Sequence, residues 1–248
     1  MTRTVVYYVY TESARARENL QHFVLQGMVE RESVDYILII NSETCSIPLG
    51  DGWSRVIKRE NAGYDFGAWR AALAETNPST YDYLFFLNDT VKGPYYIKNW
   101  MSRFTSQLTD ETLITGISIN CCTYPPIQAY YKIPVIPHVQ SMFWCVNRKG
   151  FTILQPLLMT PELEDKMQMI AQKEVGMSIA IINAGYNITC LLPLYQHDYR
   201  QKERWGEYAA LNTAAAGDIW FNGCYCGRTI HPSETIFFKT SRPLNVSG

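Results

Sequence analysis

One strand-like segment ends in a carboxylate that could hold a metal ion. The apolar run Leu84 to Leu87 is followed directly by Asn88-Asp89-Thr90. A hydrophobic strand that delivers Asp89 to its tip suits a divalent cation, Mn2+ or Mg2+, bound to a diphosphate. Asn and Asp side chains also cap turns by bonding their own backbone, so an Asx turn is the alternative interpretation.

A second set of polar residues precedes a predicted helix. In residues 61–69, Asn61, Gly63 and Gly67 surround Asp65. The glycines allow a ligand to approach the backbone closely, and Asp65 could accept hydrogen bonds from a ribose or a base. Asp65 could also simply cap the helix N-terminus, a role that is compatible with binding.

These residues lie where strands are expected to end. Continuous apolar or β-branched runs predict strands at Thr4 to Tyr10, Tyr36 to Ile40, Ser54 to Lys58, Tyr83 to Leu87, Leu113 to Ile119 and Met142 to Val146. Helical spacing predicts helices at Ala14 to Val29, Phe66 to Glu75, Ile97 to Gln107, Arg148 to Leu158 and Pro161 to Ala184. The alternation predicts an α/β fold, with a mostly parallel sheet in the first 120 residues.

The remaining segments read as loops, namely the Pro-rich stretch Tyr124 to Pro137 and the Gly-rich tail after Gln196. Ligands of open α/β sheets bind beyond the carboxyl ends of the strands. Tyr10-Thr11, which follows the first strand, therefore joins the candidate site.

Composition excludes several classes of protein. The chain has 248 residues, 47% of them hydrophobic, so a folded α/β domain is expected and disorder is not. A formal charge of -1 gives no field that would attract nucleic acid. No apolar run reaches the ~20 residues of a bilayer span. Seven scattered cysteines favour reduced thiols in a cytosolic compartment.

Three motifs together resemble a known family. They are Asn-Ala-Gly-Tyr-Asp-Phe-Gly-Ala-Trp at 61–69, Asn-Asp-Thr-Val-Lys-Gly-Pro at 88–94 and His-Pro-Ser-Glu-Thr-Ile-Phe-Phe-Lys-Thr at 231–240. In this order they are similar to the rhamnan-synthesis F family of polysaccharide glycosyltransferases. The resemblance implies a GT-A type fold, with a Rossmann-like central sheet flanked by helices and a loop-rich C-terminal segment. It also implies a single domain over residues 1–248, in which 1–120 bind the nucleotide sugar and 121–248 bind the acceptor and close the site.

The implied activity is transfer of a sugar, often a deoxyhexose such as rhamnose, from a nucleoside-diphosphate donor to a growing glycan. Asn88-Asp89-Thr90 would then occupy the place of the Asp-x-Asp motif of the fold. Only one carboxylate stands where two are usual. Asp89 could bind the cation with fewer protein ligands, or Lys92 and other donors could hold the phosphates without a metal.

The same resemblance assigns the chemistry to Glu174, with Asp89 on the donor side. Residues 174–186 resemble a helix whose N-terminal acidic residue is the catalytic base. In an inverting displacement that carboxylate removes the proton of the attacking hydroxyl. A retaining reaction would not need it, and Glu174 could instead be a solvated helix residue beside Lys173.

The last third of the chain offers further ligand candidates. His231 could complete the metal site or contact the pyrophosphate, and a structural turn is its alternative. Lys239 and Arg242 could also bind the pyrophosphate, unless they are simply solvated. Trp220, and Tyr10 at the end of the first predicted strand, could stack on a base or a sugar ring, although most aromatic residues in such a chain pack in the core.

Two rival classes are a different nucleotide-binding enzyme and a non-enzymatic module. A nucleotidyltransferase stays open, although the sequence lacks the basic Gly-rich loop expected near its N-terminus. A Rossmann-type oxidoreductase is disfavoured because Thr11-Glu-Ser-Ala-Arg-Ala replaces the expected Gly-x-Gly-x-x-Gly. A non-catalytic module that binds a sugar or nucleotide sugar stays open, since the second carboxylate is missing. A glycosylation sequon at Asn88, inside the predicted donor site, favours a cytoplasmic location, in a bacterium or in a virus-infected host.

Overall fold

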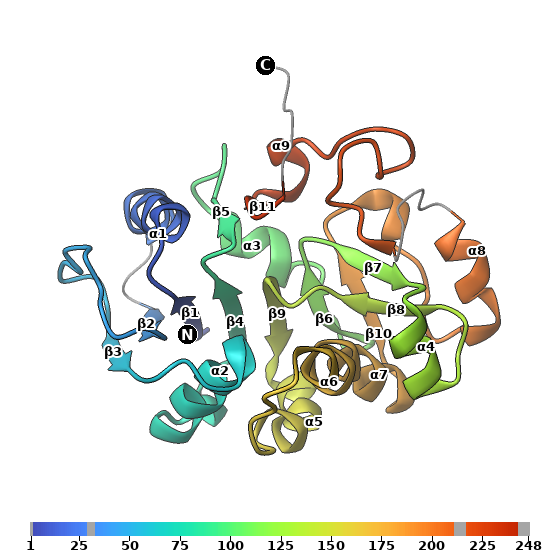
Figure 1. The fold of residues 1–248 in the computed structure, drawn as a ribbon, viewed down its shortest axis with the longest axis horizontal. Helices are drawn as coiled ribbons and strands as arrows, with labels where there is room; N and C mark the ends of the chain where they lie inside the picture. The colour runs from blue at the N-terminus through green and yellow to red at the C-terminus, as the bar shows by residue number, and fades with distance from the viewer. Residues whose placement is uncertain (1, 29–32, 211–216, 243–248) are drawn as a thin grey trace.

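The computed structural model describes residues 2–28, 33–210 and 217–242. A seven-stranded sheet crosses the molecule in the order β10-β6-β9-β4-β1-β2-β3 (Figure 1). Its strands are β1 (Thr4–Tyr10), β2 (Val34–Ile40), β3 (Arg55–Lys58), β4 (Tyr83–Asn88), β6 (Thr112–Gly116), β9 (Phe143–Asn147) and β10 (Asn187–Cys190). β1 to β4 are mutually parallel, and β9 runs antiparallel between β4 and β6. One sheet thus joins strands from both halves of the chain.

Helices cover both faces of the sheet (Figure 1). α1 and α3 lie on one face, and α2, α5 and α7 lie on the other. Their bounds are α1 (Ala14–Gln26), α2 (Tyr64–Glu75), α3 (Trp100–Thr105), α5 (Arg148–Leu158) and α7 (Gly176–Asn183). Burial on both faces explains why β1 and β4 read as continuous apolar runs and not as alternating ones.

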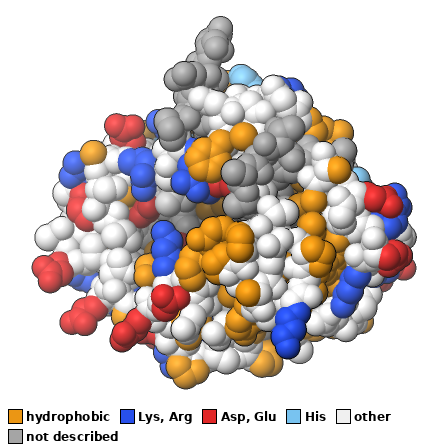
Figure 2. Space-filling view, turned by 45° about the vertical axis from the view of Figure 1, so that its right-hand side comes forward, with side chains coloured by type: hydrophobic (Ala, Val, Ile, Leu, Met, Phe, Trp, Pro, Cys, Tyr) orange, Lys and Arg blue, Asp and Glu red, His pale blue; other side chains and the backbone are white. Residues whose placement is uncertain are grey.

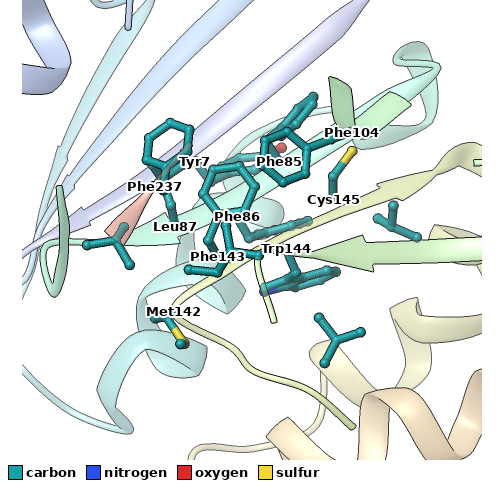
Figure 3. Packing of buried hydrophobic residues seen from close by; sticks show 14 of the residues in the cluster. Tyr7, Phe85, Phe86, Leu87, Phe104, Met142, Phe143, Trp144, Cys145 and Phe237 are labelled. Atoms are coloured by element: carbon teal, nitrogen blue, oxygen red, sulfur yellow. The ribbon is translucent and has the colours of Figure 1, made fainter. Parts of the chain in front are cut away.

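Neighbouring residues of β4 pack toward opposite layers (Figure 3). Phe85 meets Trp100 and Phe104 of α3, with ring centroids 5.2 and 6.2 Å away. Phe86 instead stacks on Trp144 of β9 at 4.1 Å. Since successive side chains of a strand point to opposite faces, this aromatic core locks β4 between the two helical layers and fixes the position of its tip.

The predicted strands and helices of the first 120 residues are confirmed, with shifts at their ends, except that the predicted helix end at Val29 lies outside the described residues. α2 begins at Tyr64, two residues before the predicted start at Phe66. The predicted strand Leu113 to Ile119 is two strands, because the chain leaves the main sheet after Gly116 and forms β7 (Ile119–Cys122).

The prediction of a loop from Tyr124 to Pro137 was wrong. It contains α4 (Pro125–Tyr131) and the start of β8 (Ile136–Val139), which pairs antiparallel with β7. Pro125 suits the first turn of a helix, where its missing N–H is not needed. The predicted helix Pro161 to Ala184 starts only at Lys166, as α6 (Lys166–Met169), and continues through a π-helical stretch (Ile170–Val175) into α7.

The tail returns to the first half of the chain. After α8 (Trp205–Ala209) and α9 (Pro232–Thr235), β11 (Phe238–Lys239) pairs antiparallel with β5 (Val91–Lys92). The ring of Phe237 lies 4.5 Å from that of Phe143, so the tail also contributes to the core. None of the described helices is long and apolar enough to span a bilayer.

Candidate functional site

A cleft of about 550 Å³ opens beyond the carboxyl end of β4. It corresponds to the hollow near the centre of Figure 2, with basic and hydrophobic side chains around it. Its polar lining comes from four parts of the chain: Asp65, Asn88 and Thr90; Asn120, His138, Gln140 and Ser141; Lys166 and Glu174; and Asp218, Lys239 and Arg242. The fold therefore brings together residues that span almost the whole sequence.

The tip of β4 is held in a defined conformation. The Asn88 Oδ1 accepts hydrogen bonds from the Thr90 backbone N–H (3.0 Å) and hydroxyl (2.5 Å), so the Asx turn expected as an alternative is present. The Asn88 Nδ2 donates to the Asp65 Oδ2 at 2.6 Å. The Asx turn uses the side chain of Asn88, and therefore leaves the carboxylate of Asp89 available for other contacts.

Asp89 points toward the end of β1 and does not line the cleft itself. Its Oδ2 accepts a 2.6 Å hydrogen bond from the backbone N–H of Thr11. Its backbone carbonyl accepts a 2.8 Å bond from the Asn19 Nδ2, which also donates to the Thr240 hydroxyl. Asn19, which the sequence did not single out, thus joins the β4 tip to the tail.

Two carboxyl groups at this edge are costly to ionise. Burial, opposed by the Thr11 N–H, raises the pKa of Asp89 to about 7, and the charge of Asp65 adds to the effect. Burial also raises the pKa of Asp65 to about 6, with a further contribution from Glu174. Groups with raised pKa values at strand ends are typical of functional sites. Here they form a series, since Glu174 raises the pKa of Asp65 and Asp65 raises that of Asp89.

The segment before Asp65 has a structural explanation of its own. Gly63 is the N-cap of α2 at φ 68°, so the alternative role of Asp65 as N-cap is wrong, and Asp65 lies in the first helical turn. A Cβ on Gly67 would lie 2.1 Å from the Ala62 carbonyl oxygen. Both glycines are therefore required by the turn into α2. Asn61 is exposed and accepts a 2.7 Å hydrogen bond from Asn41.

Glu174 lies within the π-helical stretch between α6 and α7 and lines the cleft. Its Oε1 accepts a 2.9 Å hydrogen bond from the Ser141 backbone N–H. It is half-buried, so the solvated alternative is not what the structure shows. π-helical turns often occur at functional sites. The hydrogen bond fixes one oxygen and orients the carboxylate.

Lys239 and Arg242 reach the cleft from the tail. Their side chains lie 3.5 and 2.9 Å from the Asp218 Oδ2. Burial alone would raise the pKa of Asp218, but these two cations outweigh it and hold that pKa low. Burial lowers the pKa of Lys239, and Asp218 partly offsets this. Asp218 was missed because it is an isolated carboxylate in an irregular segment.

Four residues predicted as ligands lie elsewhere. His231 is exposed, caps α9 through Ser233 and does not line the cleft, so the turn alternative describes its position. Lys92 pairs with the tail in the β5–β11 ribbon, also outside the cleft. The rings of Tyr10 and Trp220 are fully buried, because both pack in the core. The structure therefore corrects the expectation that they could stack on a ligand.

The parallel β1–β4 unit with its carboxylate-bearing strand ends and the antiparallel β9 defines a GT-A type glycosyltransferase fold. The chain belongs to the rhamnan synthesis protein F family, whose model matches residues 39–210. Fold and family together support sugar transfer as the general activity. No curated protein matches the chain significantly.

Solved structures resemble the chain at low sequence identity. The mannosyltransferase PcManGT from Pyrobaculum calidifontis, solved with GDP-Man and Mn2+, aligns with a TM-score of 0.51 and 10% identity over 76% of this chain and 54% of its own. The chain thus spans about half of that protein. CMP:2-keto-3-deoxy-manno-octonic acid synthetase with CTP aligns with a TM-score of 0.43 and 12% sequence identity, over 76% of this chain and 89% of its own. A Drosophila β-1,4-galactosyltransferase 7 mutant with manganese, UDP-Gal and xylobiose aligns with a TM-score of 0.39 and 8% sequence identity, over 76% of this chain and 65% of its own.

Proposed function

We propose that the chain transfers a sugar from a nucleoside-diphosphate donor to a hydroxyl group of a growing glycan. The observation that carries the proposal is that Asp65, Glu174 and the cations Lys239 and Arg242 face one cleft. The cleft therefore offers anionic groups for a cation or a proton, and cationic groups for phosphates.

The donor diphosphate is assigned to the edge formed by β1, β4 and the tail. Among the described residues, hydrogen bonds reach only the Oδ2 atom of Asp65 and of Asp89. Burial raises both pKa values, because it disfavours the ionised carboxylates. A positive charge nearby would stabilise the ionised form of each. In this proposal the two carboxylates would bind a divalent cation, Mn2+ or Mg2+, which would neutralise charge on the diphosphate. Within the described ranges no cluster of three or more His, Cys, Asp or Glu side chains could hold a metal ion, so the diphosphate would have to supply further ligands.

Lys239 and Arg242 complete the phosphate site in this proposal. Both already contact an anionic oxygen, that of Asp218. Guanidinium and ammonium groups form strong charge-assisted hydrogen bonds with phosphate oxygens. They would stabilise the negative charge that develops on the departing nucleoside diphosphate.

Glu174 acts as the general base for the acceptor. Its carboxylate takes the proton of the attacking hydroxyl as the new bond to the anomeric carbon forms and the bond to the diphosphate oxygen breaks. This is an inverting displacement. The bond from Ser141 holds the Glu174 Oε1, which leaves Oε2 for the acceptor.

The transferred sugar is proposed to be rhamnose or another deoxyhexose, on the basis of the family. The same basis supports a role in polysaccharide biosynthesis, and a cytoplasmic location is proposed with it.

A panel of UDP-, GDP- and dTDP-sugars, each with and without Mn2+, tests the proposal. We expect one donor to raise the melting temperature and to release nucleoside diphosphate, because a ligand of the folded state stabilises it. Asp89→Asn should lose turnover. Glu18→Gln, on the exposed surface of α1, is the matched control and should keep it. Neither binding nor hydrolysis with any donor would instead favour a non-catalytic module.

A further inference from the structure

One helix presents Glu174 to the cleft and Lys173 to a neighbouring helix. It is formed by α6, the π-helical stretch Ile170–Val175 and α7, and it lies between α5 and β8 (Figure 1). Successive residues of a helix are rotated by about 100° around its axis. The direction in which Lys173 is held therefore also fixes the direction in which Glu174 points.

Lys173 is a buried cation outside the cleft. It is only 4% exposed and does not line the cleft. Its Nζ donates to the backbone carbonyl oxygens of Leu157 (2.8 Å) and Thr160 (3.2 Å) and to the Thr160 hydroxyl. Burial lowers the pKa of Lys173, and the positive charge of Arg70 adds to the effect. An ammonium group has three hydrogens, so these contacts use all of them and leave none for a ligand.

The acceptors of Lys173 lie at the C-terminal end of α5, whose last residue is Leu158. The last carbonyl groups of a helix have no partners within it and carry partial negative charge, so they attract a cation. A Cβ on Gly176 would lie 3.2 Å from the Leu157 side chain, so the start of α7 also packs closely against α5. Lys173 thus fastens the π-helical stretch to the end of α5.

A second contact holds the interior of the π-helical stretch. The hydroxyl of Tyr131, the last residue of α4, donates a 2.6 Å hydrogen bond to the Ala171 carbonyl oxygen. In a π-helix the hydrogen-bond spacing widens from four residues to five. Side-chain donors inside a helix are typical of places where its regular ladder of hydrogen bonds is interrupted. Tyr131 therefore supports the same irregular turn as Lys173.

Two hydrogen bonds connect the helix to β8 and the residues after it. The Ser141 N–H donates to the Glu174 Oε1, and the Val139 N–H donates to the Ser178 Oγ, each at 2.9 Å. Residues four apart share a helix face, as Glu174 and Ser178 do here. Glu174 belongs to the π-helical stretch and Ser178 to α7. The first bond therefore depends on the π-helical turn, whereas the second depends only on the place of α7.

We propose that Lys173 and Tyr131 are positioning residues, which hold the π-helical turn so that the Glu174 carboxylate points into the cleft. When either contact is lost, the turn relaxes toward a regular α-helix. Removing the extra residue of the turn rotates Glu174 relative to α7 by up to about 100° and breaks its bond to Ser141. The inference rests on the proposed function, because it concerns the supports of the proposed base.

The first test measures both amide hydrogen bonds by NMR in protein labelled with 15N-serine and 15N-valine. Glu174→Ala assigns the Ser141 resonance and gives its position without the bond, and Ser178→Ala does the same for Val139. A hydrogen bond to a carboxylate moves an amide proton downfield. In Lys173→Met, which keeps an unbranched side chain without the charge, we expect the Ser141 proton to move upfield toward its position in Glu174→Ala. The Val139 resonance should stay in place.

Tyr131→Phe removes a single oxygen atom and decides the question if Lys173→Met does not fold. It should move the Ser141 resonance in the same direction. Tyr130→Phe, at the exposed neighbouring position, and the exposed Lys98→Met are the matched controls and should leave the resonance in place. An unmoved Ser141 resonance in the folded variants would overturn the proposal. Equal shifts of the Ser141 and Val139 amides would also overturn it, because the whole helix would then have moved.

The second test is the rate of sugar transfer with the donor that the wild type uses. We expect Lys173→Met to lower kcat about 10- to 100-fold, the effect of a misplaced reacting group, and Tyr131→Phe to lower it less. The donor KM and the thermal shift with the donor should be unchanged, because neither residue lies at the phosphate site. A raised donor KM with an unchanged kcat would contradict the positioning role.

The two measurements separate this inference from the function on which it rests. A moved Ser141 resonance in a protein that turns over no donor would refute the proposed function but support the positioning of Glu174. Normal transfer with an unmoved resonance in both variants would refute only the positioning role. A moved resonance with an unchanged kcat would contradict both, since the place of Glu174 would then not matter for transfer.

Discussion

Replacing Asp89 by Asn should stabilise the metal-free protein at alkaline pH while removing its activity. Asp89 is 7% exposed, and its pKa in the folded protein is raised to about 7. The ordinary value of an Asp in an unfolded chain is about 3.9. The folded state therefore retains a proton that the unfolded state loses between these two values.

The sign and size of the effect follow from this difference. Stability falls with rising pH wherever the folded state binds more protons, so the wild type loses stability from about pH 4 to about pH 7. Each pKa unit corresponds to about 1.4 kcal/mol, and about two units are traversed between pH 5 and pH 8. We expect the wild type to lose about 2–3 kcal/mol more than Asp89→Asn over that range.

Urea unfolding in EDTA at pH 5 and pH 8 measures this difference. The exposed Asp51→Asn is the control and should follow the wild type. Mn2+ at pH 8 should stabilise the wild type and leave Asp89→Asn unchanged, because the cation needs the carboxylate. Parallel pH curves for wild type and Asp89→Asn would refute the reasoning that the buried carboxylate is held at a cost to stability.

Three further substitutions test other parts of the account. Gly67→Ala should destabilise the fold by about 2–3 kcal/mol in urea unfolding, because its Cβ would overlap the Ala62 carbonyl, and an unchanged midpoint would argue against this packing. Arg242→Ala should raise the donor KM about 10-fold, as expected for a lost charged hydrogen bond. The exposed Arg103→Ala is the control and should leave the donor KM unchanged. The same donor KM in both variants would show that Arg242 does not bind the phosphates. Trp220→Phe should cost about 1–2 kcal/mol of stability through its lost buried hydrogen bond without changing the donor KM, and a raised KM would restore this ring as a ligand contact.

The parallel half of the fold could be predicted from the sequence because its strands are buried on both faces. β1 and β4 are continuous apolar runs of six or seven residues, the pattern of strands that are covered on both faces. The β7–β8 ribbon could not be predicted, since it is short and interrupted by Pro137. Asn120 on that ribbon, which lines the cleft, therefore had no periodic pattern that would have marked it as a site residue.

The candidate site could be predicted only where a residue stands in a motif or follows a strand. Asp65, Asp89 and Glu174 meet that condition, and their carboxylates interact electrostatically in the structure, Glu174 with Asp65 and Asp65 with Asp89. Asn19 and Asp218 do not. The hydrogen bond from Asn19 to Thr240 joins positions 221 residues apart, and no local pattern records such a contact.

The most direct test of the central claim is the activity of Glu174→Gln with the donor that the wild type uses. Its thermal shift with that donor should match the wild type, because the base contacts only the acceptor. Transfer should fall by about 10²- to 10⁴-fold, the usual contribution of a general base. Glu18→Gln should behave as wild type in both measurements. Transfer by Glu174→Gln at the wild-type rate would contradict the account, since the cleft would then have lost the residue assigned to its chemistry.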